Sequence, residues 1–398
     1  MPGFELIGEE EKQAVADLFD KGGVLYRYGL DAKRQNIFRV NDFENAVAKK
    51  IGVKHVLCVC NGTAALKLAL LAVGVKAGDE VITQSFTFIA TIEAILELGA
   101  VPVVTEVDKS LNMDPKDLEK KITKKTKAIV PVYMAGVAAK MEEIQAIAQK
   151  HGLPIVEDSA QAMGATYKGK YLGTLGAVGI YSLDIGKIIT TGEGGLVVTN
   201  DEKIYLKARE YSDHGHEQNP KVPRGEDTRT TWGFNYKANE LHGAIGLAQL
   251  KKLDYILQKQ RDNKRKIKEG IKNIPGIEFR EIPNPEGDAG DTLIFFMPSR
   301  EKASLFAKKL KDKGFGTKNL PDAIDWHFAG TWTQIFYNFS EFKGKDLEKV
   351  WSQSTGYLRR AIALPIMVLM PEERINQVIA AVRDTAQEVE KECLVSRT

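Results

Sequence analysis

The chain has 398 residues, and its 56 basic and 53 acidic residues leave a net charge of only +3. That balance gives no electrostatic reason to expect a nucleic-acid or membrane partner. The length exceeds what one hydrophobic core usually serves, which predicts two domains. A hydrophobic content of 43% and a charged content of 27% are typical of a globular protein, and no run approaches the roughly 20 apolar residues of a membrane helix.

The N-terminus and the cysteines both point to an intracellular protein. The opening MPGFELIGEEEKQ has acidic residues where a signal peptide would have a basic end and an apolar core, so we expect a cytoplasmic location. Cys58, Cys60 and Cys393 are too few for a disulfide framework. Cys58 and Cys60 alternate along an apolar run and are expected on one face of a strand. No partner pair accompanies them, so we predict no metal site.

Apolar strands alternate with amphipathic helices between about residues 55 and 200, which predicts right-handed crossovers and a mostly parallel, buried sheet. The expected strands are His55–Cys60, Glu80–Thr83, Val101–Glu106, Lys127–Val132, Pro154–Glu157, Val178–Ser182 and Leu196–Thr199. The expected helices are Thr63–Val73, Ala90–Leu98 and Met141–His151. The last two strands are separated by a shorter connection.

The pattern changes after about residue 240. Leu241–Leu257 is apolar at helical spacing, and Gln258–Lys272 continues as a basic helix with a solvated face. Short strands (Ile277–Ile282, Thr292–Met297) and helices near Ala303–Lys313 and from Pro371 to about Glu392 follow. We therefore predict a large α/β domain over residues 1–250 and a smaller α+β domain over residues 251–398.

Lys187 is the first candidate for chemistry. It lies between the apolar strand that ends near Ser182 and the turn Thr-Thr-Gly-Glu-Gly-Gly. An amine held in such surroundings is desolvated, which lowers its pKa and frees the neutral amine to form a Schiff base. A surface lysine beside a glycine turn is the alternative interpretation of this segment alone.

Two further loops follow strands and open toward helices. In Asn61-Gly62-Thr63-Ala64, small residues and the unpaired amides of a helix N-terminus favour a phosphate. Asp158 follows a buried strand, and ligands bind beyond the carboxyl ends of parallel strands, so its carboxylate is placed to meet a cation. An N-capping aspartate is the alternative interpretation.

One ligand would fit all three loops at once. Its phosphate would lie on residues 62–64, a protonated ring nitrogen on Asp158, and an aldehyde on Lys187. That ligand is pyridoxal 5'-phosphate, whose chemistry requires an acid at the pyridinium nitrogen and a Schiff-base lysine.

The chain resembles the DegT/StrS-type sugar aminotransferases, which have the aspartate-aminotransferase fold. Five segments resemble family motifs, in family order: NGTAALKLAL from Asn61, GDEVITQSFTFIAT from Gly78, VEDSAQAMGA from Val156, TTGEGGLVVTND from Thr190 and GFNYKANELHGAIGLAQL from Gly233. The resemblance implies a fold type I transferase, with a mostly parallel seven-stranded-type sheet and a smaller C-terminal domain.

Roles carried over by position are implied by this resemblance. Lys187 would bind the cofactor covalently and shuttle a proton, Asp158 would pair with the ring nitrogen, and Gln161 would lie near the ring hydroxyl. Phe88 would stack on the ring; either Phe86 or Phe88 is expected in the core. The remaining cofactor contacts would be made by Gly62, Thr63, Ser182 and, from the neighbouring subunit, Asn235. The family's active site therefore needs a homodimer.

Some positions depart from the common pattern. Gln84 stands where many members have Pro, Leu183-Asp184-Ile185-Gly186 replaces an aromatic, polar lead-in, and Lys237 stands where Arg is frequent. We place these residues near the mouth of the site, which argues against the usual nucleotide-sugar substrate. The opening segment and Ser212–His216 are similar to the subgroup that makes 8-amino-3,8-dideoxy-octulosonate (8-amino-Kdo), a lipopolysaccharide sugar.

The resemblance implies transfer of an amino group, with glutamate as the expected donor and a nucleotide-linked keto-sugar or an 8-oxo-Kdo-type aldehyde as acceptor. A sugar dehydratase of the same family is one alternative, but those enzymes have His in place of the Schiff-base lysine. A non-catalytic cofactor-binding regulator is another, but it would normally carry an additional DNA-binding or membrane module.

Overall fold

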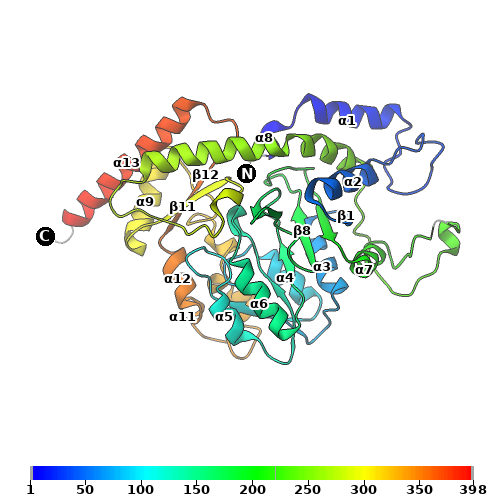
Figure 1. The fold of residues 1–398 in the computed structure, drawn as a ribbon. Coiled ribbons are helices and arrows are strands. Elements are labelled where there is room, and N and C mark those ends of the chain that lie inside the picture. Colours follow the sequence, from blue (N-terminus) through cyan, green and yellow to red (C-terminus); the bar gives the residue numbers. More distant parts are fainter. Residues whose placement is uncertain (1–2, 220, 396–398) are drawn as a thin grey trace.

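The computed structural model describes residues 3–219 and 221–395, so Met1 and Pro2 of the opening segment lie outside the described residues. Seven strands form the central sheet, in the order β1-β9-β8-β5-β4-β2-β3 (Figure 1). Single parallel bridges from Ile129 to Ile155 and from Val132 to Asp158 join its two halves. The strands are β1 (His55–Val59), β2 (Glu80–Gln84), β3 (Val101–Thr105), β4 (Thr126–Val130), β5 (Val156–Asp158), β8 (Val178–Ser182) and β9 (Gly195–Thr199).

The sheet is parallel except for β9, which runs antiparallel to both β1 and β8. The connection between β8 and β9, which lies wholly within the described residues, contains no helix, whereas parallel neighbours need a crossover connection that is usually an α-helix. The expected mostly parallel α/β sheet is confirmed. Its strands lie close to their predicted bounds.

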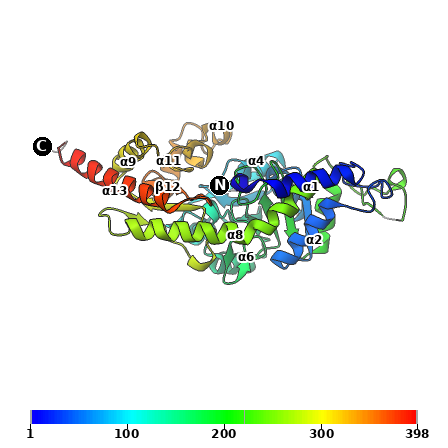
Figure 2. The ribbon, with the colours of Figure 1, turned by 90° about the horizontal axis from the view of Figure 1, so that it is seen from above.

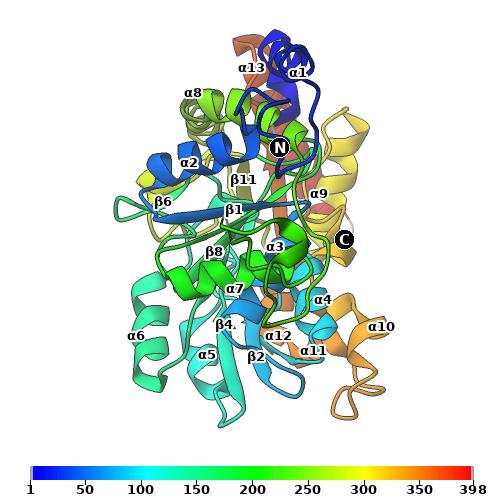
Figure 3. The same ribbon diagram turned by 90° about the vertical axis from the view of Figure 1, so that its right-hand side faces the viewer.

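Helices cover both faces of this sheet (Figure 3). β1 shows why both faces are apolar: Leu57 and Val59 pack in the core beneath α3, α4 and α7, whereas Val56 and Cys58 pack in the core beneath α2, α6 and α8. The helices of this part are α1 (Glu9–Asp20), α2 (Arg39–Ile51), α3 (Gly62–Ala72), α4 (Ala90–Glu97), α5 (Pro115–Lys121), α6 (Met141–His151) and α7 (Glu202–Ser212).

The expectation that Cys58 and Cys60 share a face is wrong. Cys58 is fully buried in one core, whereas Cys60 packs against the other. The reason is that β1 ends at Val59, and the Cys60 N–H then donates to the Tyr236 carbonyl at 2.8 Å. The period of two that relates alternate residues holds only inside a strand.

The C-terminal part contains an antiparallel three-stranded sheet in the order β10-β11-β12. Its core includes one end of α8, together with α9 and α13. The elements are β10 (Glu278–Phe279), β11 (Thr292–Phe296), α9 (Arg300–Asp312), α10 (Thr333–Phe336), α11 (Leu347–Val350), α12 (Ser352–Leu358), β12 (Ala361–Pro365) and α13 (Glu372–Val395). A small hairpin of β6 (Thr166–Tyr167) and β7 (Lys170–Tyr171) lies apart from both sheets.

One long helix, α8 (Glu240–Ile271), runs between the α2 end of the molecule and the C-terminal part (Figures 1 and 2). Near its start Gly243 lies against Arg39 and Val40 of α2, and near its end Gly270 lies against Ile379 of α13. The predicted boundary between residues 250 and 251 falls inside this helix and stays a prediction. None of the helices in the described ranges is long and apolar enough to cross a membrane.

Gln84 is not near the mouth of a site, as we expected from its departure from the family pattern; its side chain is fully buried. Its Oε1 accepts hydrogen bonds from the Met113 and Val132 N–H groups, at 2.9 and 3.2 Å, and its Nε2 donates to the Phe86 carbonyl at 2.8 Å. It therefore joins the carboxyl ends of β2 and β4 to the loop that follows β2.

Glu157 fixes the end of the neighbouring strand, β5. Its fully buried carboxylate accepts hydrogen bonds from the Tyr133 hydroxyl at 2.5 Å and from three backbone N–H groups at 2.5 to 2.8 Å, those of Gly173, Leu175 and Gly176. Charge-assisted hydrogen bonds of this kind are among the strongest in proteins. They hold the end of β5, and with it the adjacent Asp158.

We expect Glu157→Gln to lower the free energy of unfolding by about 3 kcal/mol, because one acceptor oxygen becomes a donor facing backbone N–H groups. Urea denaturation followed by circular dichroism measures the change. Glu119→Gln is the control, since this exposed residue pairs with Lys150 at the surface. Equal denaturation midpoints for the two variants would show that the buried network does not stabilise the fold.

Candidate active site

A cavity of about 570 Å³ opens at the carboxyl ends of β1, β2, β5 and β8. Seven of the eight predicted site residues line it: Gly62, Thr63, Phe88, Asp158, Gln161, Ser182 and Lys187. The sheet topology explains this convergence, because parallel strands end at the same edge. The eighth, Asn235, lies elsewhere.

The N-terminus of α3 forms one end of the cavity. The Asn61 side chain caps the helix by accepting from the Ala64 N–H at 2.8 Å, and the Asn61 carbonyl accepts from Ala65. Within the described ranges, nothing accepts from the N–H groups of Gly62 and Thr63. These donors, at the positive end of a helix dipole, suit a phosphate.

Ser182 and Gly62 lie in close contact at that end. A Cβ on Gly62 would come within 2.8 Å of the Ser182 Cβ and 3.0 Å of its Oγ. Glycine is thus required here by the close approach of β8 to the helix, rather than by its backbone angles. The Ser182 hydroxyl also accepts weakly from the Asp184 N–H, at 3.3 Å.

Asp158 is a buried carboxylate, 4% exposed, at the end of β5. Its Oδ2 accepts from the Thr91 hydroxyl at 2.8 Å and its Oδ1 from the Ala160 N–H at 3.1 Å. No Lys, Arg or His of the described chain forms an ion pair with it. Burial raises the pKa of Asp158, against the opposing effects of these hydrogen bonds and of the Lys187 charge. A cationic ligand would compensate for that desolvation.

Lys187 faces the same cavity from the loop after β8. Burial lowers the pKa of its ammonium group, while the nearby carboxylates of Asp184 and Asp158 act in the opposite direction. Two backbone hydrogen bonds hold this loop at Lys187. The Lys187 N–H donates to the Asp184 carbonyl, and the Lys187 carbonyl accepts from the Gly3 N–H, each at 2.9 Å.

Phe88 and Gln161 complete the predicted set in the cavity. Phe88 is 42% exposed, whereas Phe86 is 1% exposed, so Phe86 is the core aromatic of the pair. The Gln161 Oε1 accepts from the Ala135 N–H at 2.9 Å, which leaves its Nε2 as a donor. A phenolic oxygen on a bound ring would meet that donor.

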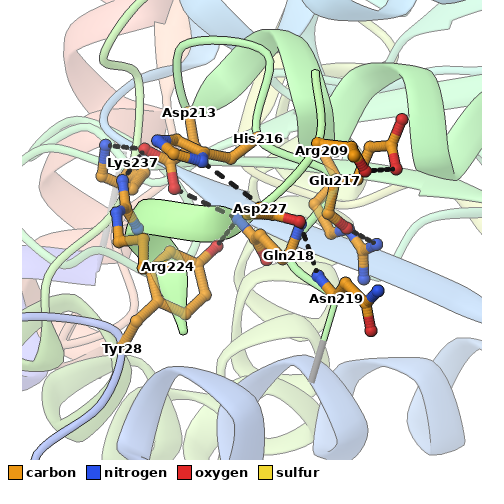
Figure 4. Close-up of polar contacts among 11 residues, drawn as sticks. Tyr28, Arg209, Asp213, His216, Glu217, Gln218, Asn219, Arg224, Asp227 and Lys237 are labelled. Carbon is orange, nitrogen blue, oxygen red and sulfur yellow. Dashed lines mark hydrogen bonds and ion pairs between the residues drawn. The ribbon is translucent and has the colours of Figure 1, made fainter. Parts of the chain in front are cut away.

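Asn235 is exposed on the loop that joins α7 to α8 and projects from the body of the molecule (Figure 1). The backbone of Asn235 forms a β-bridge with Asp213 in this projecting loop. The buried Asp213 carboxylate closes this loop by accepting from Arg224 Nη2 at 2.6 Å and Lys237 Nζ at 2.5 Å (Figure 4). Burial alone would raise the pKa of Asp213, but these two cations hold it below its usual range. Lys237 therefore acts inside the loop, not at the mouth of the cavity as we expected.

Sequence reasoning missed several residues of the cavity. Thr91 was within the GDEVITQSFTFIAT segment, one helical turn after Thr87. That spacing could have placed both hydroxyls beside Asp158, and the two hydroxyls lie 2.7 Å apart. Asn319 and His327 come from the C-terminal part of the chain, where no motif was recognised. In the described part of the chain, no cluster of His, Cys, Asp or Glu is arranged to hold a metal ion.

The cavity fits pyridoxal phosphate on its own chemistry. It offers free helix N–H groups for a phosphate, a buried acid without a cationic partner for the ring nitrogen, and an amine of lowered pKa. These three features lie in one cavity of sufficient volume.

Comparison with known proteins agrees with this geometry. The spore coat polysaccharide biosynthesis protein SpsC of Bacillus subtilis (strain 168) is 32% identical over 387 residues, which cover 95% of each chain. GDP-perosamine synthase of Caulobacter vibrioides is 43% identical over 218 residues, 54% of this chain and 56% of the relative. The solved structure of Helicobacter pylori PseC, an aminotransferase involved in pseudoaminic acid biosynthesis, has a TM-score of 0.81 at 26% identity and covers 96% of this chain and 97% of its own.

The family comparison extends over nearly the whole chain and confirms the resemblance carried by the five motifs. Residues 9–383 match the model of the DegT/DnrJ/EryC1/StrS aminotransferases. Enzymes of this family use pyridoxal phosphate, in agreement with the cavity. The chain belongs to the DegT/DnrJ/EryC1/StrS aminotransferase family and is a pyridoxal-phosphate-dependent aminotransferase.

Proposed function

We propose that this enzyme moves an amino group from glutamate to a keto- or aldehydo-sugar that is a precursor of a surface polysaccharide. The observation that carries the proposal is the juxtaposition, in one cavity, of an amine of lowered pKa and a buried acid without a cationic partner. Support for a sugar acceptor comes from the relatives, which are named for spore coat polysaccharide and perosamine synthesis.

Each residue has a role in this proposal. The N–H groups of Gly62 and Thr63 and the hydroxyl of Ser182 bind the phosphate, and Phe88 packs on the ring. Asp158 holds the proton on the ring nitrogen, and the Gln161 amide donates to the ring oxygen. When bound, pyridoxal phosphate supplies an electron-accepting ring. Lys187 binds the cofactor covalently and, as a neutral amine, takes and returns the proton at the substrate carbon.

The acceptor and the assembly are parts of the same proposal. Asn235 is accessible on the projecting loop, so it can reach the phosphate of a second subunit in a symmetric dimer. The narrower resemblance to the 8-amino-Kdo subgroup stays a prediction. Single-turnover transfer from the pyridoxamine form to GDP-linked 4-keto-sugars and to 8-oxo-Kdo would distinguish the two acceptor classes.

We expect Lys187→Ala to bind the cofactor without covalent attachment and to lose amine transfer by orders of magnitude, because the nucleophile and the proton carrier are both removed. Borohydride reduction of the wild type followed by peptide mapping should place the cofactor on the peptide containing residue 187. Lys203→Ala, on the exposed start of α7, is the control and should keep activity. Labelling of a different lysine would overturn the assignment.

Asp158→Asn should retain the fold but slow amine transfer by orders of magnitude, because it keeps the size of the side chain and removes the charge that stabilises the ring proton. Stopped-flow measurement of the glutamate half-reaction tests this directly. Circular dichroism and the thermal midpoint check the fold. A variant with nearly the wild-type rate would show that Asp158 does not act on the ring nitrogen.

Mixing Lys187→Ala subunits with Asn235→Asp subunits should restore part of the activity that each homodimer lacks. In a shared-site dimer, one site carries both lesions and the other carries neither, whereas the Asp charge repels phosphate in the Asn235→Asp homodimer. Differently tagged subunits allow mixed dimers to be purified and assayed. Mixed dimers that stay inactive would place Asn235 in its own subunit's site.

A further inference from the structure

His327, which comes from the C-terminal part of the chain, forms part of the cavity wall. Its segment is paired with the loop that follows β2. The Thr87 N–H donates to the His327 carbonyl at 3.0 Å, the Ile89 N–H to Trp326 at 3.1 Å, and the Ala329 N–H to the Ser85 carbonyl at 2.8 Å. These backbone bonds fix His327 beside Phe88, with the two ring centroids 5.5 Å apart.

The ring orientation of His327 is set by one hydrogen bond. Nδ1 lies 2.8 Å from the Ala323 carbonyl oxygen, and a carbonyl oxygen can only accept, so Nδ1 carries the proton. Burial lowers the pKa of His327, and the positive charges of Lys187 and Lys318 lower it further against the Ala323 bond. The ring is therefore neutral near pH 7, and its other nitrogen, Nε2, is an acceptor without a proton.

Nε2 has no hydrogen-bond partner anywhere in residues 3–219 and 221–395, and the residue as a whole is only 8% exposed. A nitrogen lone pair on a cavity wall can accept a hydrogen bond from a ligand group that carries a hydrogen. It disfavours a carboxylate or a phosphate, which are themselves acceptors only. A hydroxyl group next to the reacting carbonyl of a sugar matches this requirement.

We propose that His327 is a specificity-determining residue whose Nε2 accepts a hydrogen bond from a hydroxyl group adjacent to the reacting carbonyl of the acceptor. The inference rests on the proposed function, since it concerns the acceptor of the same site. It assigns His327 to the second half-reaction, because glutamate has no hydroxyl group. A site built to bond a hydroxyl discriminates against analogues that lack one, since the acceptor is then left unpaired.

Two substitutions separate the two ring nitrogens. His327→Asn places an amide near Nδ1, so it can keep the bond to the Ala323 carbonyl while it removes the acceptor at the Nε2 position. His327→Gln reaches the Nε2 position and can accept there. His151→Phe is the control, because His151 is exposed at the end of α6, away from the cavity.

The probes are lactaldehyde and propanal, which differ by one hydroxyl group next to the carbonyl. Each is reacted with the pyridoxamine form of the holoenzyme in single turnovers, and the rate constants are expressed per free, unhydrated aldehyde. We expect His327→Asn to lower the lactaldehyde-to-propanal ratio about tenfold relative to the wild type, the effect of one hydrogen bond. His327→Gln should recover part of the ratio, and His151→Phe should not change it.

The glutamate half-reaction serves as the second measurement, because a role in folding or in chemistry common to both halves would slow it as well. We expect the rate of the glutamate half-reaction in His327→Asn to equal that of the wild type. An unchanged aldehyde ratio, or equal slowing of both half-reactions, overturns the inference and leaves the proposed function intact. A wild type that reacts with glutamate but transfers no amine to lactaldehyde or to any keto-sugar overturns both.

Discussion

The active site depends on a carboxylate buried without a cationic partner of its own. Asp158 remains in the interior because Thr91 and Ala160 donate to its two oxygens, yet burial still raises its pKa. A cationic ring nitrogen would offset part of that desolvation, which would couple cofactor binding to the electrostatics of the protein. Burial also lowers the pKa of Lys187, which favours the neutral amine that the proposed covalent chemistry requires.

Buried hydrogen-bonded groups hold this site in place. Gln84 joins β2 and β4 to the loop of Phe88, and Glu157 fixes the end of β5. The Trp326–Ala329 segment then pairs with the same loop and adds His327 to the cavity wall. The side chains that line the cavity are thus positioned by buried hydrogen bonds rather than by surface ion pairs, whose contribution to stability is small.

The projecting loop shows a second use of buried charge. The Asp213 carboxylate pairs with both Arg224 and Lys237 and so ties together distant parts of the loop (Figure 4). Asn235 is exposed on this loop and does not line its own cavity. Lys237 is paired with Asp213 inside the loop, so local structure explains this residue.

The sequence by itself determined the α/β fold and most of the strands, because periodicity is local. Strand-end loops indicated Gly62, Thr63, Asp158 and Lys187, and the family resemblance added Phe88, Gln161 and Ser182. It also determined the family, since five motifs occur in family order. Tertiary structure alone decided which distant segments meet. It brought His327 and Asn319 to the cavity, buried Gln84 and separated Cys60 from Cys58. The His327 segment pairs with a loop more than 200 positions earlier, Gln84 bonds two segments outside its own strand, and Cys60 lies beyond the end of its strand. None of these arrangements leaves a local pattern in the sequence.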